Sequence, residues 1–91
     1  HAGFNEKLPL DEQDLQHMMW RYDGDAIEDQ PNYTFEGKHV VHGHVQHIGG
    51  PVLLENTTNL DTFAWYTGRL AVGVFDGPGG PVEILWAEGP A

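Results

Sequence analysis

Cysteine is absent from the 91 residues of this chain, and only four lysines and arginines stand against fourteen aspartates and glutamates. Without thiols, neither a disulfide framework nor a thiolate metal site can form. The formal net charge of −10 argues against nucleic-acid polymers and anionic membrane surfaces as partners, because both require a basic face. Strong negative charge fits solubility, a cation site or a basic partner.

Long apolar runs are missing as well. No segment approaches the roughly 18 consecutive apolar residues of a membrane span, and no apolar stretch follows a basic start as it does in a secretory leader. We therefore expect a soluble, cytoplasmic protein with no membrane partner. Ninety-one residues correspond to one small domain, near the size at which core burial only just exceeds the entropy of ordering.

Histidine, in contrast, is concentrated in one place: four of the six histidines fall between positions 39 and 47. Apolar residues followed by glycines in segment 38–50 predict a strand that runs into a turn. Side chains at i and i+2 of a strand share a face, so His42 and His44 are expected to point the same way. Because neutral imidazole is a common metal ligand, this segment is a candidate metal corner. A solvated loop and a zinc site of His42, His44 and His47 are the alternatives.

The segment 11–20 predicts a short helix with an acidic first turn, where the helix dipole favours negative charge. Leu15, Met18 and Met19 are spaced i, i+3, i+4, which predicts one apolar stripe packed into the core. The acidic segment 23–29 has neither the glycine nor the terminal glutamate of an EF-hand. It is therefore expected to be a solvated loop rather than a calcium site.

The rest of the chain predicts about five strands. Extended segments are expected at 33–35, in the histidine segment, at 52–54 and at 60–66, with a turn at 56–59. Residues 69–75 and 82–87 flank a loop rich in glycine and proline. This pattern is typical of a β-hairpin.

Several short motifs occur in a fixed order along the chain. They are His1-Ala2-Gly3, Leu10 to Asp14, Met18-Met19-Trp20, Val40-Val41-His42-Gly43-His44, Asn59-Leu60-Asp61-Thr62 and Thr67-Gly68-Arg69-Leu70. In this order and spacing they resemble the C-terminal half of calcineurin-like metallophosphoesterases. The resemblance is greatest to the branch of bacterial serine/threonine protein phosphatases and diadenosine tetraphosphatases, and it covers nearly all of the chain.

The resemblance implies a fold of the α+β or α/β class. Residues 1–91 would be a single partial domain: the C-terminal half of a two-sheet sandwich, mostly β with one short helix. Such a half exposes an apolar sheet face. The resemblance therefore also implies association with a missing N-terminal half, or self-association through that sheet.

The resemblance further implies a hydrolase acting on phosphate esters, with either a phosphoprotein or a dinucleoside polyphosphate as the phosphorylated substrate. Two divalent ions, manganese or alternatively iron or zinc, would activate a water that attacks phosphorus. By position, His1 and His44 would bind one of these ions. His42 is a candidate catalytic residue beside the site. Arg21 is the candidate phosphate clamp, one position earlier than in the family.

The sequence also departs from the family. The Asp-x-His, Gly-Asp-x-x-Asp-Arg and Gly-Asn-His-Glu motifs, which supply most of the other ligands, occur nowhere in the chain. Val45-Gln46 replaces Thr-Pro, and Phe63 replaces a glycine. We therefore expect negligible activity from the isolated chain. The alternative is a non-catalytic acidic binding module on a phosphatase scaffold.

Overall fold

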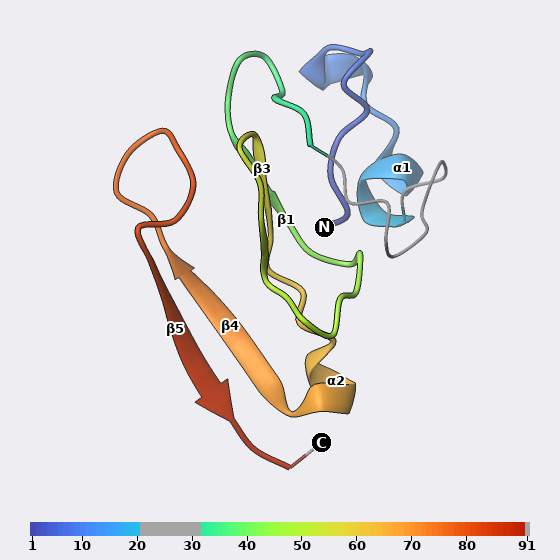
Figure 1. The fold of residues 1–91 in the computed structure, drawn as a ribbon. Coiled ribbons are helices and arrows are strands. Elements are labelled where there is room, and N and C mark those ends of the chain that lie inside the picture. Colours follow the sequence, from blue (N-terminus) through green and yellow to red (C-terminus); the bar gives the residue numbers. More distant parts are fainter. Residues whose placement is uncertain (21–31, 91) are drawn as a thin grey trace.

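The computed structural model describes residues 1–20 and 32–90. In these ranges the chain is a small mixed α+β protein with two sheets and short helices (Figure 1). In order, the elements are the 3-10 helix η1 (Leu10–Glu12), α1 (Leu15–Trp20), β1 (Val40–His42), β2 (Val52–Leu53), β3 (Thr57–Asn59), α2 (Ala64–Thr67), β4 (Arg69–Val74) and β5 (Glu83–Glu88). No helix within the described ranges is both long and apolar enough to cross a membrane.

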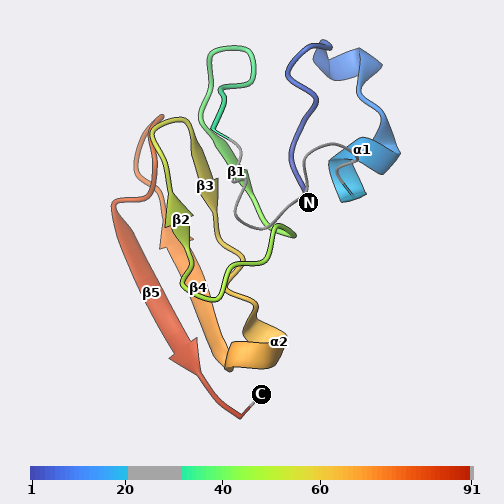
Figure 2. The same ribbon diagram turned by 45° about the vertical axis from the view of Figure 1, so that its right-hand side comes forward.

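The first sheet has the strand order β1-β3-β2, with β3 parallel to β1 and antiparallel to β2 (Figure 2). Its central strand is entirely polar, yet Thr57, Thr58 and Asn59 are all buried. The Thr58 hydroxyl is 2.7 Å from Nε2 of His39, and the Asn59 amide donates to the carbonyl of Val45. The turn predicted at 56–59 is therefore wrong, because these polar side chains find partners inside the sheet.

Residues 60–66, predicted to be extended, are also different in the structure. Asp61 Oδ1 accepts the backbone N–H of Phe63 at 2.8 Å, and the Thr67 hydroxyl donates to the Thr62 carbonyl at 3.1 Å. These short-range bonds offer the backbone an alternative to a sheet ladder. The chain consequently turns into α2 and ends it at Gly68, whose φ is 71°.

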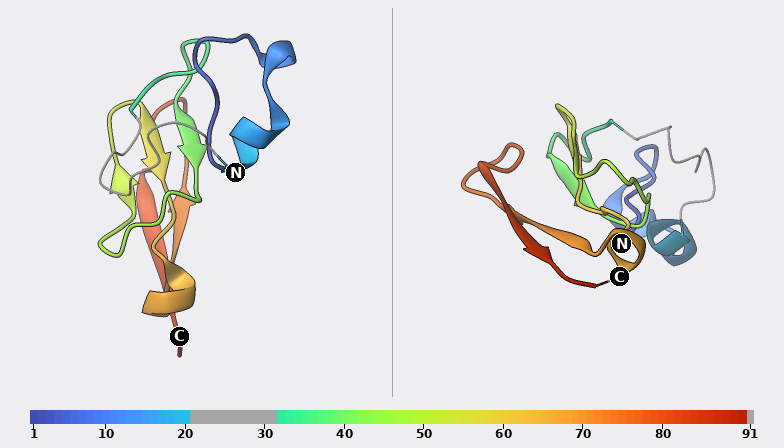
Figure 3. Two further views of the ribbon diagram at one scale, coloured as in Figure 1. Left: turned by 90° about the vertical axis from the view of Figure 1, so that its right-hand side faces the viewer. Right: turned by 60° about the horizontal axis from the view of Figure 1, so that its bottom comes forward.

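The hairpin prediction is confirmed. Strands β4 and β5 pair antiparallel, from Arg69 opposite Glu88 to Val74 opposite Glu83. In the right-hand view of Figure 3, this orange and red hairpin lies to one side of the green and yellow strands. The guanidinium of Arg69 lies over the Trp86 ring, 4.4 Å from its centroid.

The core is small. Among the described residues, the buried hydrophobic side chains are Ala2, Phe35, Val40, Val45 and Ala71. The helical stripe predicted to pack into this core does not do so: Leu15 is 62% exposed, Met19 is exposed, and α1 buries no residue. The predicted helix 11–20 is divided into η1 and α1. The described part of the chain therefore does not fully cover any face of α1.

An exposed apolar sheet face, which the resemblance implies, is present on the hairpin. Leu70 and Val72 are two positions apart in β4, so they point to the same side of the sheet. Leu85 is the register partner of Val72 and shares that side. All three side chains are exposed.

Candidate metal centre

The side chains of His1 and His44 lie together although they are far apart in sequence. Their ring centroids are 5.0 Å apart and the ring planes are tilted by 56°. The backbone joins the same two segments, because the Gly43 N–H donates to the His1 carbonyl at 2.8 Å. The Ala2 N–H donates to the Met18 carbonyl at 2.6 Å, so the first residues are also tied to α1.

His44 occupies a rare backbone conformation. Strand β1 ends at His42, and the Val45 N–H donates to the Gly43 carbonyl at 2.8 Å across His44, whose φ is 67°. This pairing across one residue of positive φ is a γ-turn of the strained kind. The prediction that His42 and His44 share one strand face is therefore wrong, because the strand ends before His44. Strained residues of this sort cluster at functional sites.

Asn59 of the central strand supports this turn. Its side-chain amide donates to the Val45 carbonyl, and its Oδ1 accepts the Asp61 N–H at 3.0 Å. Both Asn59 and Val45 are buried. The sequence pointed to Asn59 only as a motif position, whereas the structure shows it holding the loop that carries His44.

His42 is an interior residue. Its side chain is only 6% exposed, and its Nδ1 lies 2.9 Å from the Gly43 carbonyl. Since a carbonyl only accepts hydrogen bonds, Nδ1 is the protonated nitrogen. This burial favours a role in supporting the loop over direct contact with a substrate.

Trp20 is a further neighbour of the centre that the sequence did not assign. Its ring meets that of His44 nearly at a right angle, with centroids 5.7 Å apart. The motif Met18-Met19-Trp20 was the only signal for it. Arg21 and the acidic segment 23–29 lie outside the described residues.

The separation of the two rings fits a shared metal ion. Two imidazoles on one ion, with metal–nitrogen bonds of about 2.1 Å and angles between octahedral and tetrahedral values, have ring centres about 4.5 to 5.2 Å apart. The 5.0 Å between His1 and His44 falls within this range. The described ranges bring together no group of three or more histidine and carboxylate side chains placed for one ion. Within these ranges His42, His44 and His47 do not form such a group, and the alternative zinc site stays a prediction.

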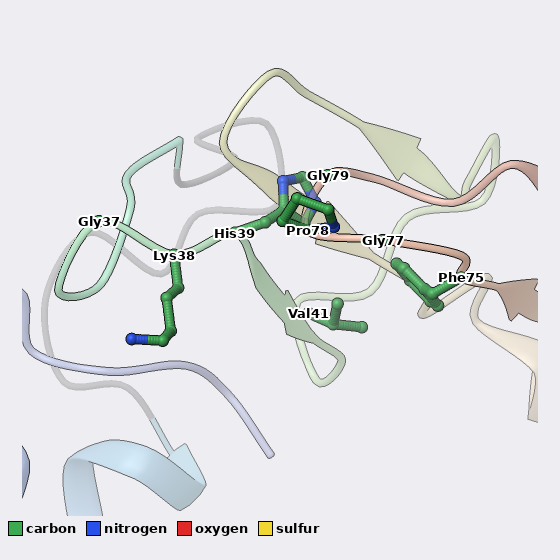
Figure 4. Close-up of a pocket in the computed structure, with 8 residues that line it drawn as sticks. All are labelled: Gly37, Lys38, His39, Val41, Phe75, Gly77, Pro78 and Gly79. Carbon is green, nitrogen blue, oxygen red and sulfur yellow. The ribbon is translucent and has the colours of Figure 1, made fainter.

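A separate cleft of about 400 Å³ lies at the opposite end of β1, between that strand and the loop of the hairpin. Val41, Phe75 and Pro78 contribute apolar surface to it. In Figure 4 the ammonium group of Lys38 points away from Val41 and Phe75. Neither His1 nor His44 lines this cleft, so it is not part of the candidate metal centre.

Comparison of the chain with known protein families, characterised proteins and solved structures finds no match.

Proposed function

We propose that this chain is the C-terminal part of a two-metal phosphoesterase, in which His1 and His44 bind one of the two divalent ions. The whole enzyme would hydrolyse phosphate esters of a phosphoprotein or a dinucleoside polyphosphate, with manganese, iron or zinc. Support comes from the ordered motifs and, above all, from one observation. The ring centroids of His1 and His44, the two histidines that the motifs pair, lie 5.0 Å apart.

The bound ions would supply Lewis acidity, activating a water and neutralising charge on the phosphoryl oxygens. The chain itself supplies two imidazoles and the means of holding them. Asn59 fixes the Val45 carbonyl, and Gly43 joins the loop to His1. Two protein ligands are fewer than a metal pair requires, so we assign the remaining ligands to the missing half.

Charge makes the ions essential for substrate binding as well. A chain with a formal charge of −10 repels a phosphate group. Divalent ions at His1 and His44 would reverse that local potential. Arg21, the candidate phosphate clamp, would add a second positive group after α1.

The decisive test is the reading frame upstream of His1. If it encodes Asp-x-His and Gly-Asn-His-Glu, we expect the whole protein to hydrolyse p-nitrophenyl phosphate with manganese. Turnover should stop with EDTA and in the His44→Ala variant. The 91-residue chain alone should show negligible turnover, and robust EDTA-sensitive activity from it would contradict the assignment of ligands to a missing half.

The same experiment separates the alternative function. An initiator methionine directly before His1, with no turnover, would favour the non-catalytic acidic binding module. His47→Ala is the matched control for His44→Ala. It removes a histidine of the same segment that the motifs do not assign to the metal, so the whole enzyme should keep its activity.

A further inference from the structure

The short helix α2 carries two large aromatic side chains into solvent. Trp65 is 70% exposed and Tyr66 is 61% exposed. Figures 1 and 2 place α2 away from β1 and the N-terminal segment, near the C-terminal end of the chain. Side chains so exposed contribute little to the core of the described chain. Exposed aromatic clusters are typical of recognition sites.

Phe63 joins these two rings into one cluster. Its ring centroid lies 4.8 Å from that of Trp65, with the planes at 89°, and 5.3 Å from that of Tyr66, with the planes at 29°. The Trp65 and Tyr66 centroids are 6.2 Å apart with their planes at 71°. The planes of the two exposed rings are therefore steeply inclined to each other, and Phe63 lies against both.

The backbone under the cluster is held in place and is strained. Phe63 has φ 60° and ψ 42°, in the left-handed region, which is rare for a bulky residue. Its N–H is held by Asp61 Oδ1 at 2.8 Å, and the Gly68 N–H closes α2 on the Ala64 carbonyl at 2.8 Å. Strain of this kind persists where the surroundings over-determine it and accompanies functional sites.

The charge of the chain and the faces of its aromatic rings indicate that this cluster would bind a cation. The faces of aromatic rings attract cations electrostatically, and the net charge of −10 favours cations and repels anions near the surface. Within the described part of the chain this interaction already occurs between Arg69 and Trp86. Nε of Arg69 also lies 3.7 Å from Oε1 of Glu88. Arg69, which follows α2 in the sequence, is therefore engaged by Trp86 and Glu88 rather than by the aromatic cluster.

We propose that Trp65 and Tyr66, backed by Phe63, form a binding site for an organic cation, of the quaternary or methylated ammonium class. Because both rings are exposed and their centroids are 6.2 Å apart, a cation on their solvent side can lie within about 6 Å of both centroids, the range of a cation–π contact. This site is independent of the metal centre.

Choline and 3,3-dimethylbutan-1-ol test the site, because they share size and shape but differ in charge. We would titrate each into the ¹⁵N-labelled 91-residue chain at constant ionic strength and follow the Trp65 indole N–H together with the backbone amide of Tyr66, which the Trp65 variants also retain. Choline should bind about fivefold more tightly than the neutral alcohol, which corresponds to roughly 1 kcal/mol of cation–π energy. Equal binding of the two compounds would overturn the proposal, because it would indicate a merely apolar patch.

Variants test whether the preference for choline depends on the Trp65 ring. Trp65→Leu should abolish the preference for choline, while Trp65→Phe should retain most of it because a ring remains. Trp20→Leu, which removes an exposed tryptophan next to the metal centre, should leave it unchanged. A preference that survives Trp65→Leu, or shifts confined to residues next to carboxylates, would show general charge attraction and overturn the site. The comparison of the two compounds on the unaltered chain needs no variant to fold.

Discussion

Gly43 donates its backbone N–H to the carbonyl oxygen of His1 at 2.8 Å. This bond joins the first residue of the chain to the loop after β1 without using either imidazole ring. The backbone therefore helps to bring the two rings together, and this bond occupies neither ring's nitrogens. A site that is formed in advance loses less freedom when it binds an ion.

The γ-turn at His44 predicts opposite effects on stability and metal binding. Glycine adopts positive φ without the penalty carried by other residues. His44→Gly should therefore raise the free energy of unfolding by about 1 kcal/mol in metal-free buffer. Its affinity for zinc or manganese should fall by at least about tenfold, the smallest loss usual even for residues that only orient a ligand. Urea unfolding and calorimetric metal titration measure the two quantities.

His44→Ala separates the two causes, because it removes the imidazole but keeps the positive φ. It should lose metal affinity as His44→Gly does, without the gain in stability. Unchanged metal affinity in both variants would remove His44 from the proposed centre.

Asn59 is expected to contribute strongly to the stability of the first sheet. Asn59→Ala removes the donor to the Val45 carbonyl and the acceptor of the Asp61 N–H. Because the Val45 carbonyl would lose its buried partner, we expect a loss of about 1 to 3 kcal/mol in unfolding free energy. The midpoint of urea unfolding measures this change. Asn56→Ala, which removes an amide from the residue just before β3, is the control and should change the midpoint little.

Gly3, in the His-Ala-Gly motif, is expected to be needed for the correct placement of His1. Its φ is 119°, and a Cβ there would lie 2.6 Å from the Tyr33 hydroxyl, which accepts the Phe4 N–H at 2.7 Å. Gly3→Ala should therefore destabilise the protein by about 1 kcal/mol or more and weaken metal binding. Gly79→Ala is the control, since a Cβ there meets no atom within 4 Å. Equal unfolding midpoints for the two variants would contradict this role.

The exposed hairpin face predicts self-association that depends on salt. Two copies of a chain with charge −10 repel each other at low ionic strength, and salt screens that repulsion. Sedimentation of the isolated chain should show more dimer as salt is raised. Val72→Lys should suppress this dimer by placing a charge in the apolar face. Thr34→Lys adds the same charge at an exposed position outside the hairpin, so persistence of the dimer there and not in Val72→Lys identifies the face.

The part of the fold that could be predicted is the part built on alternation and turn residues. The hairpin of β4 and β5 has both signals, and its pairing was predicted closely. The pairing of His1 with His44 was predicted from the motifs alone, since nothing in their spacing brings two such distant residues together. Its role in binding metal stays a prediction.

Other elements could not be predicted, because their causes lie in tertiary contacts or in particular side-chain bonds. Strand β3 has the composition of a turn, and its pairing with β1 and β2, together with the bonds to His39 and Val45, makes it a buried strand. Residues 64–67 look extended, yet the bonds of Asp61 and Thr67 turn them into α2. Periodicity identifies an apolar stripe on α1, but it does not say whether a partner element covers that stripe.

The polar side chains of β3 affect how precisely the register of the first sheet is fixed. The Thr58 hydroxyl and the Asn59 amide hold β3 through directional bonds, whereas an apolar strand of similar shape would be held by contacts that tolerate displacement. Sliding β3 by one residue would separate Asn59 from Val45 and Thr58 from His39 at the same time. The position of the loop that presents His44 therefore depends on the matching of hydrogen-bonding groups in β3, the strand next to β1.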